Sequence, residues 1–470
     1  MDKPLTLLNH IAPSFPVPTL HLHDQVQTLD QKLTINGPSK LSGHVHISGS
    51  KNSSLAILAA TLCCSGTTKL RDVPNLSDTR AMGSILSSLS AEVEVSGDEV
   101  LINADGVSCV EPCRDRVKEI RGGFFVIGPL LARFGEAAVA LPGGCDIGSR
   151  PVDLFMRGLR ALGAIVELRD GKVEARVRNG RRLVAGKFRL DYPSVGATET
   201  LMMAACLADG VTILSNVAKE PEVIDLAHFL NNSGAHIEGA GSSKIRILGQ
   251  SQLHGTECTI TPDRIEAGTF LLAAAITRSC INISPVFPSH ISSLVHKLQT
   301  AGCRIRRSGR DSLEVSAVCE NGDRVFRGFN VTTSPFPGFP TDLQPQTMAL
   351  LTTCNGLSRV EESVFERRMT HVQELQKLGA RIDLSGSRAL IYGKEKASCF
   401  LFPSALVGSE LTAMDLRGGA ALVLAGLAAE GRTEISAAGH IYRGYEDIDR
   451  KLAGLGADIQ ISSSTASVLA

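Results

Sequence analysis

The stretch Leu378-Gly379-Ala380-Arg381-Ile382-Asp383 decides the fold, because near copies of it recur along the whole chain. In each copy, a Gly or Ser and a small residue separate a helical pattern from a segment of alternating apolar and polar residues. The Gly suits a left-handed helix cap, and the alternation is typical of a half-buried strand. Six copies, about 68 to 77 residues apart, account for nearly the whole chain. They begin at Leu89, Leu162, Ser233, Ala301, Leu378 and Leu455.

Each copy closes a longer unit. Upstream of most copies lies an apolar segment rich in Ala and Leu, which predicts a buried inner helix, followed by a short strand and an amphipathic outer helix. The predicted inner helices cover residues 54–66, 200–210, 268–278, 348–356 and 419–431, and predicted outer helices include 222–232 and 445–454. Predicted strands that follow inner helices include 212–214 and 433–435. Six units of helix, strand, helix, strand and strand predict an α/β protein with six pseudo-repeats, three in each of two domains.

The composition narrows the range of partners. The 470 residues carry 48 Lys and Arg against 48 Asp and Glu, with no Trp and only 4% aromatic residues. This balanced charge and the scarcity of aromatic side chains argue against nucleic acid as the main partner. The longest apolar runs, such as 420–429, are too short to span a bilayer, so we expect no membrane insertion. The expected partner is a small molecule or another protein.

Cysteine usage and the first residues bear on the compartment. The twelve cysteines show no CxxC spacing, which argues against a disulfide framework or a zinc ribbon and favours a reducing compartment. Eleven of them, including the close pairs Cys63-Cys64 and Cys109…Cys113, are expected to be small packing residues. Residues 1–32, with four prolines and no clear periodicity, are expected to form a flexible leader. It resembles neither a secretory signal nor an organelle transit peptide, although a remnant of a trimmed transit peptide fits it.

Two segments carry residues suited to chemistry. Segment 47–52 (ISGSKN) passes from an alternating strand into the first inner helix, where backbone N–H groups and Lys51 suit a phosphate group. An ordinary helix cap is an equally good interpretation of it. Segment 141–151 (LPGGCDIGSRP) predicts an exposed, shaped loop in which Cys145 is placed to react.

A third group consists of charged residues near the repeat junctions. Taken singly, each is more often a surface charge or a helix cap. Their recurrence at equivalent junctions favours a common cleft, because equivalent positions in a pseudo-symmetric fold can converge. These residues are Arg121 and the charged members of 262–266, 339–342, 365–368, 415–417 and 442–444.

Together the motifs resemble the UDP-N-acetylglucosamine 1-carboxyvinyltransferase family of enolpyruvyl transferases, which opens peptidoglycan synthesis. The motifs are 48–52 (SGSKN), 141–153 (LPGGCDIGSRPVD), 194–198 (SVGAT), 220–222 (EPE), 262–268 (PDRIEAG), 339–342 (FPTD), 415–417 (DLR) and 443–445 (RGY). The resemblance implies a two-domain inside-out α/β barrel whose first strand completes the domain formed by the C-terminal half. The implied domains are residues 52–262, which carry the Cys145 loop, and residues 33–51 together with 263–470.

The resemblance also implies a reaction. The enolpyruvyl group of phosphoenolpyruvate is transferred to the 3′-hydroxyl of UDP-N-acetylglucosamine, and phosphate is released through a tetrahedral intermediate. By resemblance, Cys145 donates a proton, can carry a phospholactoyl adduct and is the target of the epoxide fosfomycin, while Asp342 is the base. The implied partners are these two substrates. No metal or organic cofactor is implied, and the oligomeric state is not indicated.

The other site residues are carried over position by position. Lys51 and Arg443 are implied as catalytic, and with Arg121, Arg150 and Arg417 they surround the anionic substrate. Clustering these cations without the ligand costs repulsion, which suggests an open form that closes on substrate. The remaining implied substrate contacts are Asn52, Pro151, Val152, Asp153, Leu154, Ser194, Val195, Gly196, Asp263, Glu266 and Val364.

The sequence departs from the family pattern at several positions. Gly122-Gly123 and Gly418-Gly419 stand where Ala-Ser is usual, so we expect two looser loops. Arg367 replaces an Asn and Tyr442 replaces an Asp, while Asp146 stands where the family often has a neutral residue. None of these changes removes a residue on which the implied chemistry depends.

Two alternative functions are kept. One is a catalytically silent homologue that binds or regulates, since a fold alone does not fix function. The other is 5-enolpyruvylshikimate-3-phosphate synthase, which shares the fold and chemistry but lacks the Pro-Gly-Gly-Cys loop. Segments such as 194–203 and 266–278 resemble the cyanobacterial branch of the family, and both the bacterial cytoplasm and the plastid stroma are compatible with the sequence.

Overall fold

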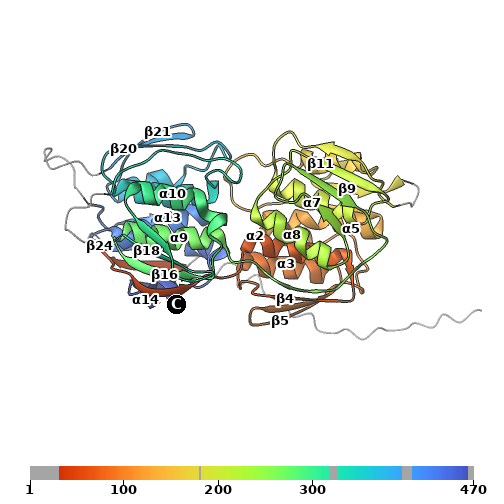
Figure 1. Ribbon diagram of the computed structural model, residues 1–470, viewed down its shortest axis with the longest axis horizontal. Coiled ribbons are helices and arrows are strands. Elements are labelled where there is room, and N and C mark those ends of the chain that lie inside the picture. The colour runs from red at the N-terminus through yellow and green to blue at the C-terminus, as the bar shows by residue number, and fades with distance from the viewer. Residues whose placement is uncertain (1–30, 179–181, 318–325, 394–404, 464–470) are drawn as a thin grey trace, which may run out of the picture.

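The protein folds into two lobes that lie side by side along its long axis (Figure 1). The computed structural model describes residues 31–178, 182–317, 326–393 and 405–463. The predicted leader lies outside the described residues except for Gln31 and Lys32, which already belong to the first strand. No helix within those described ranges is long and apolar enough to cross a membrane.

Within the described residues, six inner helices alternate with six outer helices. The inner helices are α2 (Lys51–Ala60), α5 (Ile127–Phe134), α7 (Val195–Cys206), α9 (Arg264–Ile276), α11 (Gln344–Thr352) and α13 (Leu416–Ala428). The outer helices are α3 (Ser77–Ser88), α6 (Asp153–Ala161), α8 (Pro221–Asn232), α10 (Ser292–Ala301), α12 (His371–Lys377) and α14 (Ile448–Gly454). Between them lie α4 (Arg114–Glu119) and the short 3₁₀ helices η1 (Thr61–Cys63), η2 (Arg121–Val126), η4 (Pro288–Ile291), η5 (Thr341–Leu343) and η6 (Ala438–Arg443).

Each repeat carries one small sheet. In the N-terminal lobe, the first sheet has the strand order β15 (Glu257–Thr259), β4 (Thr67–Arg71), β6 (Glu99–Asn103), β5 (Glu92–Ser96). The second has the order β7 (Glu136–Ala140), β9 (Lys172–Arg176), β8 (Ile165–Arg169). The third has the order β10 (Lys187–Arg189), β11 (Val211–Ser215), β13 (Lys244–Leu248), β12 (His236–Glu238). A further pair joins β3 (Cys64–Ser65) to β14 (Leu253–His254). In the C-terminal lobe, the first sheet has the strand order β2 (Ser42–His46), β16 (Cys280–Ser284), β18 (Leu313–Ser316), β17 (Arg304–Arg307). The second has the order β19 (Val331–Thr332), β20 (Leu357–Glu361), β22 (Arg388–Tyr392), β21 (Arg381–Ser385). The third has the order β23 (Glu410–Thr412), β24 (Gly431–Ser436), β1 (Gln31–Gly37), β25 (Asp458–Ser463).

The first two strands belong to the lobe formed by the end of the chain. Strand β1 pairs antiparallel with both β24 and β25, with Leu33 opposite Ile435 on one side and Ile461 on the other. It therefore fills the place that β22 fills in the preceding sheet. Strand β2 pairs in parallel with β16. The predicted order of helix, strand, helix, strand and strand is thus confirmed, with β1 supplying the last strand of the sixth repeat.

The caps that revealed the repeat adopt the expected backbone conformation. All six residues have a positive φ, as a left-handed cap requires. The values run from 72° at Ser90 to 120° at Gly302, and the others are Gly163, Gly234, Gly379 and Gly456. Ser90 shows that the position tolerates a side chain, but glycine adopts this conformation without the steric cost that a Cβ brings.

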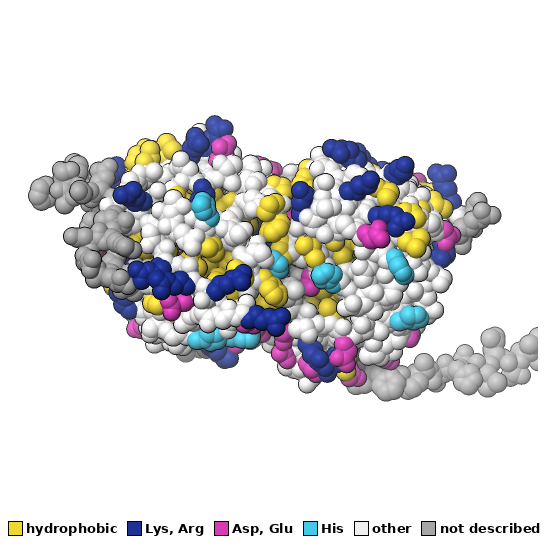
Figure 2. Space-filling view, in the orientation of Figure 1, with side chains coloured by type: hydrophobic (Ala, Val, Ile, Leu, Met, Phe, Trp, Pro, Cys, Tyr) yellow, Lys and Arg dark blue, Asp and Glu magenta, His cyan; other side chains and the backbone are white. Residues whose placement is uncertain are grey.

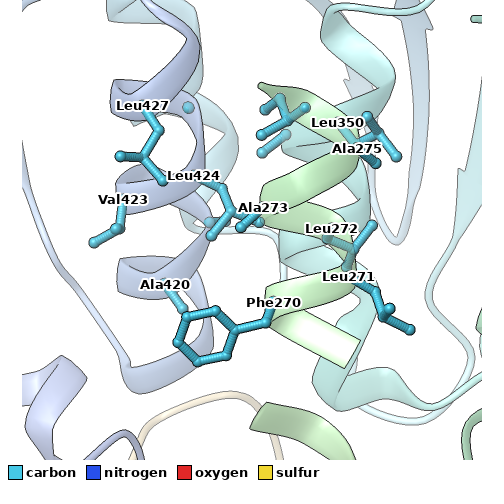
Figure 3. Close-up of a cluster of buried hydrophobic side chains, with 14 of the residues drawn as sticks. Phe270, Leu271, Leu272, Ala273, Ala275, Leu350, Ala420, Val423, Leu424 and Leu427 are labelled. Atoms are coloured by element: carbon cyan, nitrogen blue, oxygen red, sulfur yellow. The ribbon is translucent and has the colours of Figure 1, made fainter. Parts of the chain in front are cut away.

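Two separate hydrophobic cores lie around the two bundles of inner helices. One core runs from Leu55 to Ile260, and the other combines residues from Leu33 to Ile47 with residues from Ile265 onward. Figure 3 shows how small residues let these helices approach, with Phe270 of α9 directed at Ala420 of α13. The chain passes from one core to the other between Ile47 and Leu55 and again between Ile260 and Ile265. The predicted domain boundaries, near Lys51 and Asp263, fall within these two intervals, and their exact positions remain a prediction.

One expectation about the cysteines is wrong. Cys63 and Cys64 are buried, as expected for packing residues, but Cys109 and Cys113 are exposed. They lie between β6 and α4, in a segment without regular structure that contributes little to either core. The spacing of the two cysteines had no periodicity from which burial could be inferred.

Candidate active site

The chain crosses from one lobe to the other twice, and the two crossing segments lie next to each other. Gly49 pairs with Pro262 as an isolated bridge, and Ser50 N–H donates to the Thr261 carbonyl over 2.7 Å. A Cβ at Gly49 would lie 1.8 Å from the Asp72 carbonyl oxygen, so only glycine fits this crossing. The side chain of Ser50 caps α2 by accepting from the N–H of Ser53, at 3.3 Å. The ordinary helix cap is therefore present, while the phosphate-binding interpretation of the segment stays a prediction.

Asp78 joins two of the predicted cations from opposite lobes. Arg443, at the end of η6, contacts one carboxylate oxygen through Nε at 2.9 Å, and Lys51 Nζ lies 3.6 Å from the other. Burial lowers the pKa of Lys51, and Asp78 opposes that shift. Asp78 was not predicted as a site residue, because it and Arg443 are 365 positions apart and no local motif marks it.

The Cys145 loop reaches across to the C-terminal lobe. Cys145 is half-buried and packs against the core of that lobe, and its Sγ lies 3.5 Å from Nη1 of Arg443. Two more predicted cations hold the loop from within the N-terminal lobe, since Arg150 donates to the Cys145 carbonyl and Arg121 donates to the Arg150 carbonyl. Burial and the neighbouring Arg150 lower the pKa of Arg121 to about 10. The thiol thus sits beside a cation at the boundary between lobes.

Asp342 lies in a corner of buried arginines. It belongs to η5, and its carboxylate contacts Arg368 at 2.7 Å and Arg417 at 3.0 Å. Burial by itself would raise the pKa of Asp342, but Arg368, Arg417 and Lys51 outweigh that effect and hold the pKa well below its ordinary value. The carboxylate is therefore charged at neutral pH and, with these partners, a weak base. Arg368 was not among the predicted site residues, although its segment had been noted.

Arg417 is buried and keeps hydrogen-bonding capacity that no described residue uses. It begins α13 behind the cap Asp415, is 1% exposed, and lies 5.2 Å from the Tyr445 ring centre. Among the described residues no hydrogen-bond partner contacts its buried Nη1. A buried guanidinium nitrogen without a partner is costly, so a ligand oxygen at this position would relieve that cost.

Asn52 lies in a second interlobe cluster. Arg264 of the C-terminal lobe makes a two-pronged contact with Glu222 of the N-terminal lobe, at 3.1 and 3.2 Å, and Asn52 donates to the same carboxylate at 3.4 Å. Burial tends to raise the pKa of Glu222, but Arg264 outweighs it and lowers the pKa. Arg264 belongs to the charged residues noted near the repeat junctions and Glu222 lies in a quoted motif, but neither was assigned a substrate contact or a catalytic role.

The predicted nucleotide contacts gather at the N-termini of α6 and α7. Val152 and Ser194 are the cap residues, followed by Asp153 and Val195. A Cβ at Gly196 would lie 3.0 Å from both the Phe125 and Phe155 rings, which explains a small residue there. Two neighbouring helix N-termini suit a diphosphate.

The remaining predicted contacts differ in exposure. Pro151 is exposed and Val364 is half-buried, so both are open to a ligand. Leu154 is 1% exposed and belongs to the N-terminal core. It supports the site from below rather than lining it.

Two predicted substrate contacts are engaged elsewhere. Glu266 is 3% exposed, pairs with Lys451 and accepts from the Ser48 N–H at 3.1 Å. Asp263 caps α9 by accepting from Ile265 and Glu266 N–H groups, at 2.7 and 3.0 Å. Both carboxylates hold the chain crossings together in this structure.

The two glycine pairs do not form looser loops. Gly122 and Gly123 lie buried in η2, and Gly418 and Gly419 lie buried in the first turn of α13. A Cβ at Gly419 would lie 2.6 Å from a side-chain carbon of Ile441, and one at Gly123 would lie 3.0 Å from Ile85. The helices and their neighbours close the space that a loop would have left open.

Known proteins with related sequences decide the family. The chain is 49% identical over 432 residues to "UDP-N-acetylglucosamine 1-carboxyvinyltransferase" of Gloeobacter violaceus, covering 92% of this chain and 90% of that relative. The same enzyme of Synechocystis is 46% identical over 93% of this chain and 96% of the relative. The chain belongs to this family. The predicted family and its cyanobacterial relatives are thereby confirmed.

Broader comparisons agree on the fold. The family model described as EPSP synthase (3-phosphoshikimate 1-carboxyvinyltransferase) matches residues 35–452. The crystal structure of the enolpyruvyl transferase NikO from Streptomyces tendae superimposes with a TM-score of 0.79 at 26% identity, over 92% of this chain and 99% of that one. EPSP synthase from Acinetobacter baumannii, at 18% identity and a TM-score of 0.70, shares the fold alone. The predicted two-domain enolpyruvyl transferase fold is confirmed.

Proposed function

We propose that the protein transfers the enolpyruvyl group of phosphoenolpyruvate to the 3′-hydroxyl of UDP-N-acetylglucosamine and releases phosphate. The observation that carries the proposal is the meeting of Cys145 with Arg443, 3.5 Å apart, across the lobe boundary. A proton donor and an anion-binding cation are thereby brought together only when the lobes are joined. The 49% identity to an enzyme of that name supports the choice of substrates.

The addition step needs two proton transfers. The sugar hydroxyl oxygen bonds to C2 of the enol while the methylene carbon C3 gains a proton, which gives a tetrahedral intermediate. Elimination then removes a proton from C3 and releases phosphate, which restores the double bond. We assign the donation to C3 to Cys145 and the removal of the hydroxyl proton to Asp342, since general acids and bases must reach the atoms that they serve.

Asp342 becomes a base only if its arginines change partners. In the structure its negative charge is shared by Arg368 and Arg417. A substrate carboxylate or phosphate at the unpartnered Nη1 of Arg417 would draw positive charge away from Asp342 and raise its pKa. Binding of the anionic substrate would therefore activate the base that the addition requires.

The five predicted cations have compensating partners within the protein. Asp78 pairs with Lys51 and Arg443, Asp342 pairs with Arg417, and backbone carbonyls accept from Arg121 and Arg150. These partners offset the repulsion expected for a bare cluster. The proposed anion site is thus assembled in advance, and the nucleotide sugar would lie toward the N-termini of α6 and α7.

A phosphate-release assay tests the proposal. Purified protein with both substrates is expected to release phosphate. Cys145→Ala is expected to release it about 10²- to 10⁴-fold more slowly, and the exposed Cys109→Ala serves as the matched control. Release with shikimate 3-phosphate in place of the nucleotide sugar would indicate the rival enzyme. No release with either acceptor would indicate a silent homologue.

The position of Cys145 also supports a covalent test of the site. We propose that fosfomycin alkylates this thiol when the nucleotide sugar is present. Intact-mass analysis of wild type and Cys145→Ala should show one adduct in the first and none in the second. An adduct in both proteins would mean that another cysteine reacts.

A further inference from the structure

We propose that Glu366 and Arg367 form a clasp that holds the Cys145 loop closed against the C-terminal lobe. Both are positioning residues, because they touch the loop and not the reacting atoms. The inference deepens the proposed function, since it rests on the role assigned to Cys145. It concerns how the loop is held, which can be measured without turnover.

Three contacts make up the clasp. The Arg367 guanidinium lies 3.2 Å from the Asp146 carboxylate, and the Arg367 N–H donates to the Ile147 carbonyl over 3.2 Å. Glu366 accepts from the Ser149 N–H over 2.7 Å. Loop residues on both sides of Gly148 are thus held from the opposite lobe.

The fit at Gly148 shows that the loop lies closely against the clasp. Its φ is 132°, and a Cβ there would lie 2.6 Å from a carboxylate oxygen of Glu366. The backbone conformation favours glycine, and a Cβ there would displace the Glu366 carboxylate from its present position. The lowered pKa of Glu366, caused first by the Ser149 N–H, agrees with a carboxylate that stays charged and accepts this bond.

The loop has few other attachments. Residues 143–150 contain no helix or strand. Inside the N-terminal lobe, Arg121 contacts this segment and Gly143 closely approaches the Lys118 carbonyl. Within the loop, Arg150 and the Ile147 N–H both donate to the Cys145 carbonyl. These contacts shape the loop but do not fix it to the other lobe, a task shared by the clasp, Arg443 and the packing of Cys145 against the core of that lobe.

The clasp also connects the two proposed catalytic groups. The next residue, Arg368, contacts Asp342 at 2.7 Å, and the preceding Phe365 packs under the Arg150 guanidinium at 5.9 Å. One short segment therefore contacts both the loop of the acid and the base. Opening the clasp would separate Cys145 from a site that otherwise stays in place.

The charge pair should make loop closure depend on salt. The side chains of Asp146 and Arg367 are 77% and 66% exposed, so salt screens their attraction. An exposed pair of this kind changes an equilibrium by about fivefold at most. We expect Arg367→Asn to raise the rate at which iodoacetamide alkylates Cys145 by about that factor at low salt.

Peptide mass mapping of the alkylated protein tests the clasp, with exposed Cys109 as the internal reference. Asp146→Asn should match Arg367→Asn, and the charge swap Asp146→Arg with Arg367→Asp should restore the slow rate. In wild type the rate should rise with salt toward that of Arg367→Asn, whose rate should not respond. The control Arg246→Asn removes another exposed ion pair, that of Arg246 with Glu238, 3.5 Å apart, and should leave the Cys145 rate unchanged.

The outcomes are separable. Equal Cys145 rates in wild type, Arg367→Asn and Asp146→Asn at low salt would overturn the clasp, as would a charge swap that stays fast. If one variant fails to fold, the other tests the same pair. A salt-sensitive clasp in a protein that releases no phosphate would keep this inference and overturn the proposed function instead.

Discussion

The two halves of the proposed site are held in opposite ways. Asp342 lies between Arg417 and Arg368, which are 1% and 4% exposed and sit on or beside helices of the C-terminal lobe. Cys145 lies in a loop without regular structure, fastened by exposed contacts from the other lobe. On the face seen in Figure 2, charged side chains of both signs are scattered rather than gathered, and apolar side chains lie in the hollow between the lobes. From this contrast we expect the Asp342 carboxylate to keep its position and the Cys145 thiol to move with its loop.

The largest effect is expected from removing the charge of the fixed corner. Asp342→Asn should lower the rate of phosphate release by about 10²- to 10⁴-fold, because a proton acceptor is lost. It should also lower the free energy of unfolding by about 3 kcal/mol, because two buried guanidinium groups lose their carboxylate. Phosphate release and urea unfolding measure both effects, with exposed Asp383→Asn as the control. A variant as stable as wild type would contradict the fixed corner.

The movable half should separate activity from stability. Cys145→Ala is expected to lose about 10²- to 10⁴-fold in phosphate release. Its free energy of unfolding should stay within about 0.5 kcal/mol of wild type, since the thiol is only half-buried at the end of a loop. The same two assays compare it with Asp342→Asn. If Cys145→Ala and Asp342→Asn lowered the free energy of unfolding equally, the proposed contrast between a movable thiol and a fixed carboxylate would be contradicted.

The stability of the protein should depend on pH through Glu266, at the chain crossing that joins the two lobes. Burial raises the pKa of Glu266 from 4.5 to about 7. Between pH 4.5 and about pH 7, the Glu266 carboxyl has lost its proton in the unfolded chain but keeps it in the folded protein. The free energy of unfolding therefore falls as pH rises through this range. Relative to Glu266→Gln, wild type should therefore lose about 2 to 3 kcal/mol across this range and stay level above it. Urea unfolding from about pH 5 to about pH 8 measures this difference, and a constant difference would contradict it.

The smallest effect concerns motion. Amide hydrogens of residues 143–150 should exchange faster than those of α11, because the loop opens without unfolding the core. Adding both substrates should slow the loop amides and leave α11 unchanged. Hydrogen exchange followed by mass spectrometry resolves the two segments. Loop amides as protected as α11 in the free protein would remove the basis for a movable half.

Much of the fold could be predicted because the repeat is local. The six caps, the flanking strands and the existence of five inner helices follow from patterns within a few residues. Each of these helices begins three to five residues before its predicted start. The inner helix α5 was not assigned, because it has only eight residues and Pro129 lies inside its first turn. The predicted outer helix 445–454 begins only at Ile448, since η6 and an irregular turn come before it.

The site was less predictable, because its partners are distant in sequence. Cys145 and Arg443 are 298 positions apart, and Asp78, Arg264 and Arg368 gain their roles only through contacts that no local pattern encodes. Asp146 and Arg367 were noted as separate departures from the family, yet they form one ion pair across the lobes. Glu266 was expected to contact substrate, but burial next to Lys451 gives it a structural partner.

The central claim is that the lobe boundary holds the reacting atoms between Cys145 and Asp342. A crystal structure with the nucleotide sugar and phosphoenolpyruvate, or with an unreactive analogue of it, tests this claim most directly. The account predicts Cys145 Sγ on the side of the enol methylene and the Asp342 carboxylate about 3 Å from the sugar 3′-hydroxyl. A nucleotide sugar bound with its 3′-hydroxyl out of reach of both residues would contradict it.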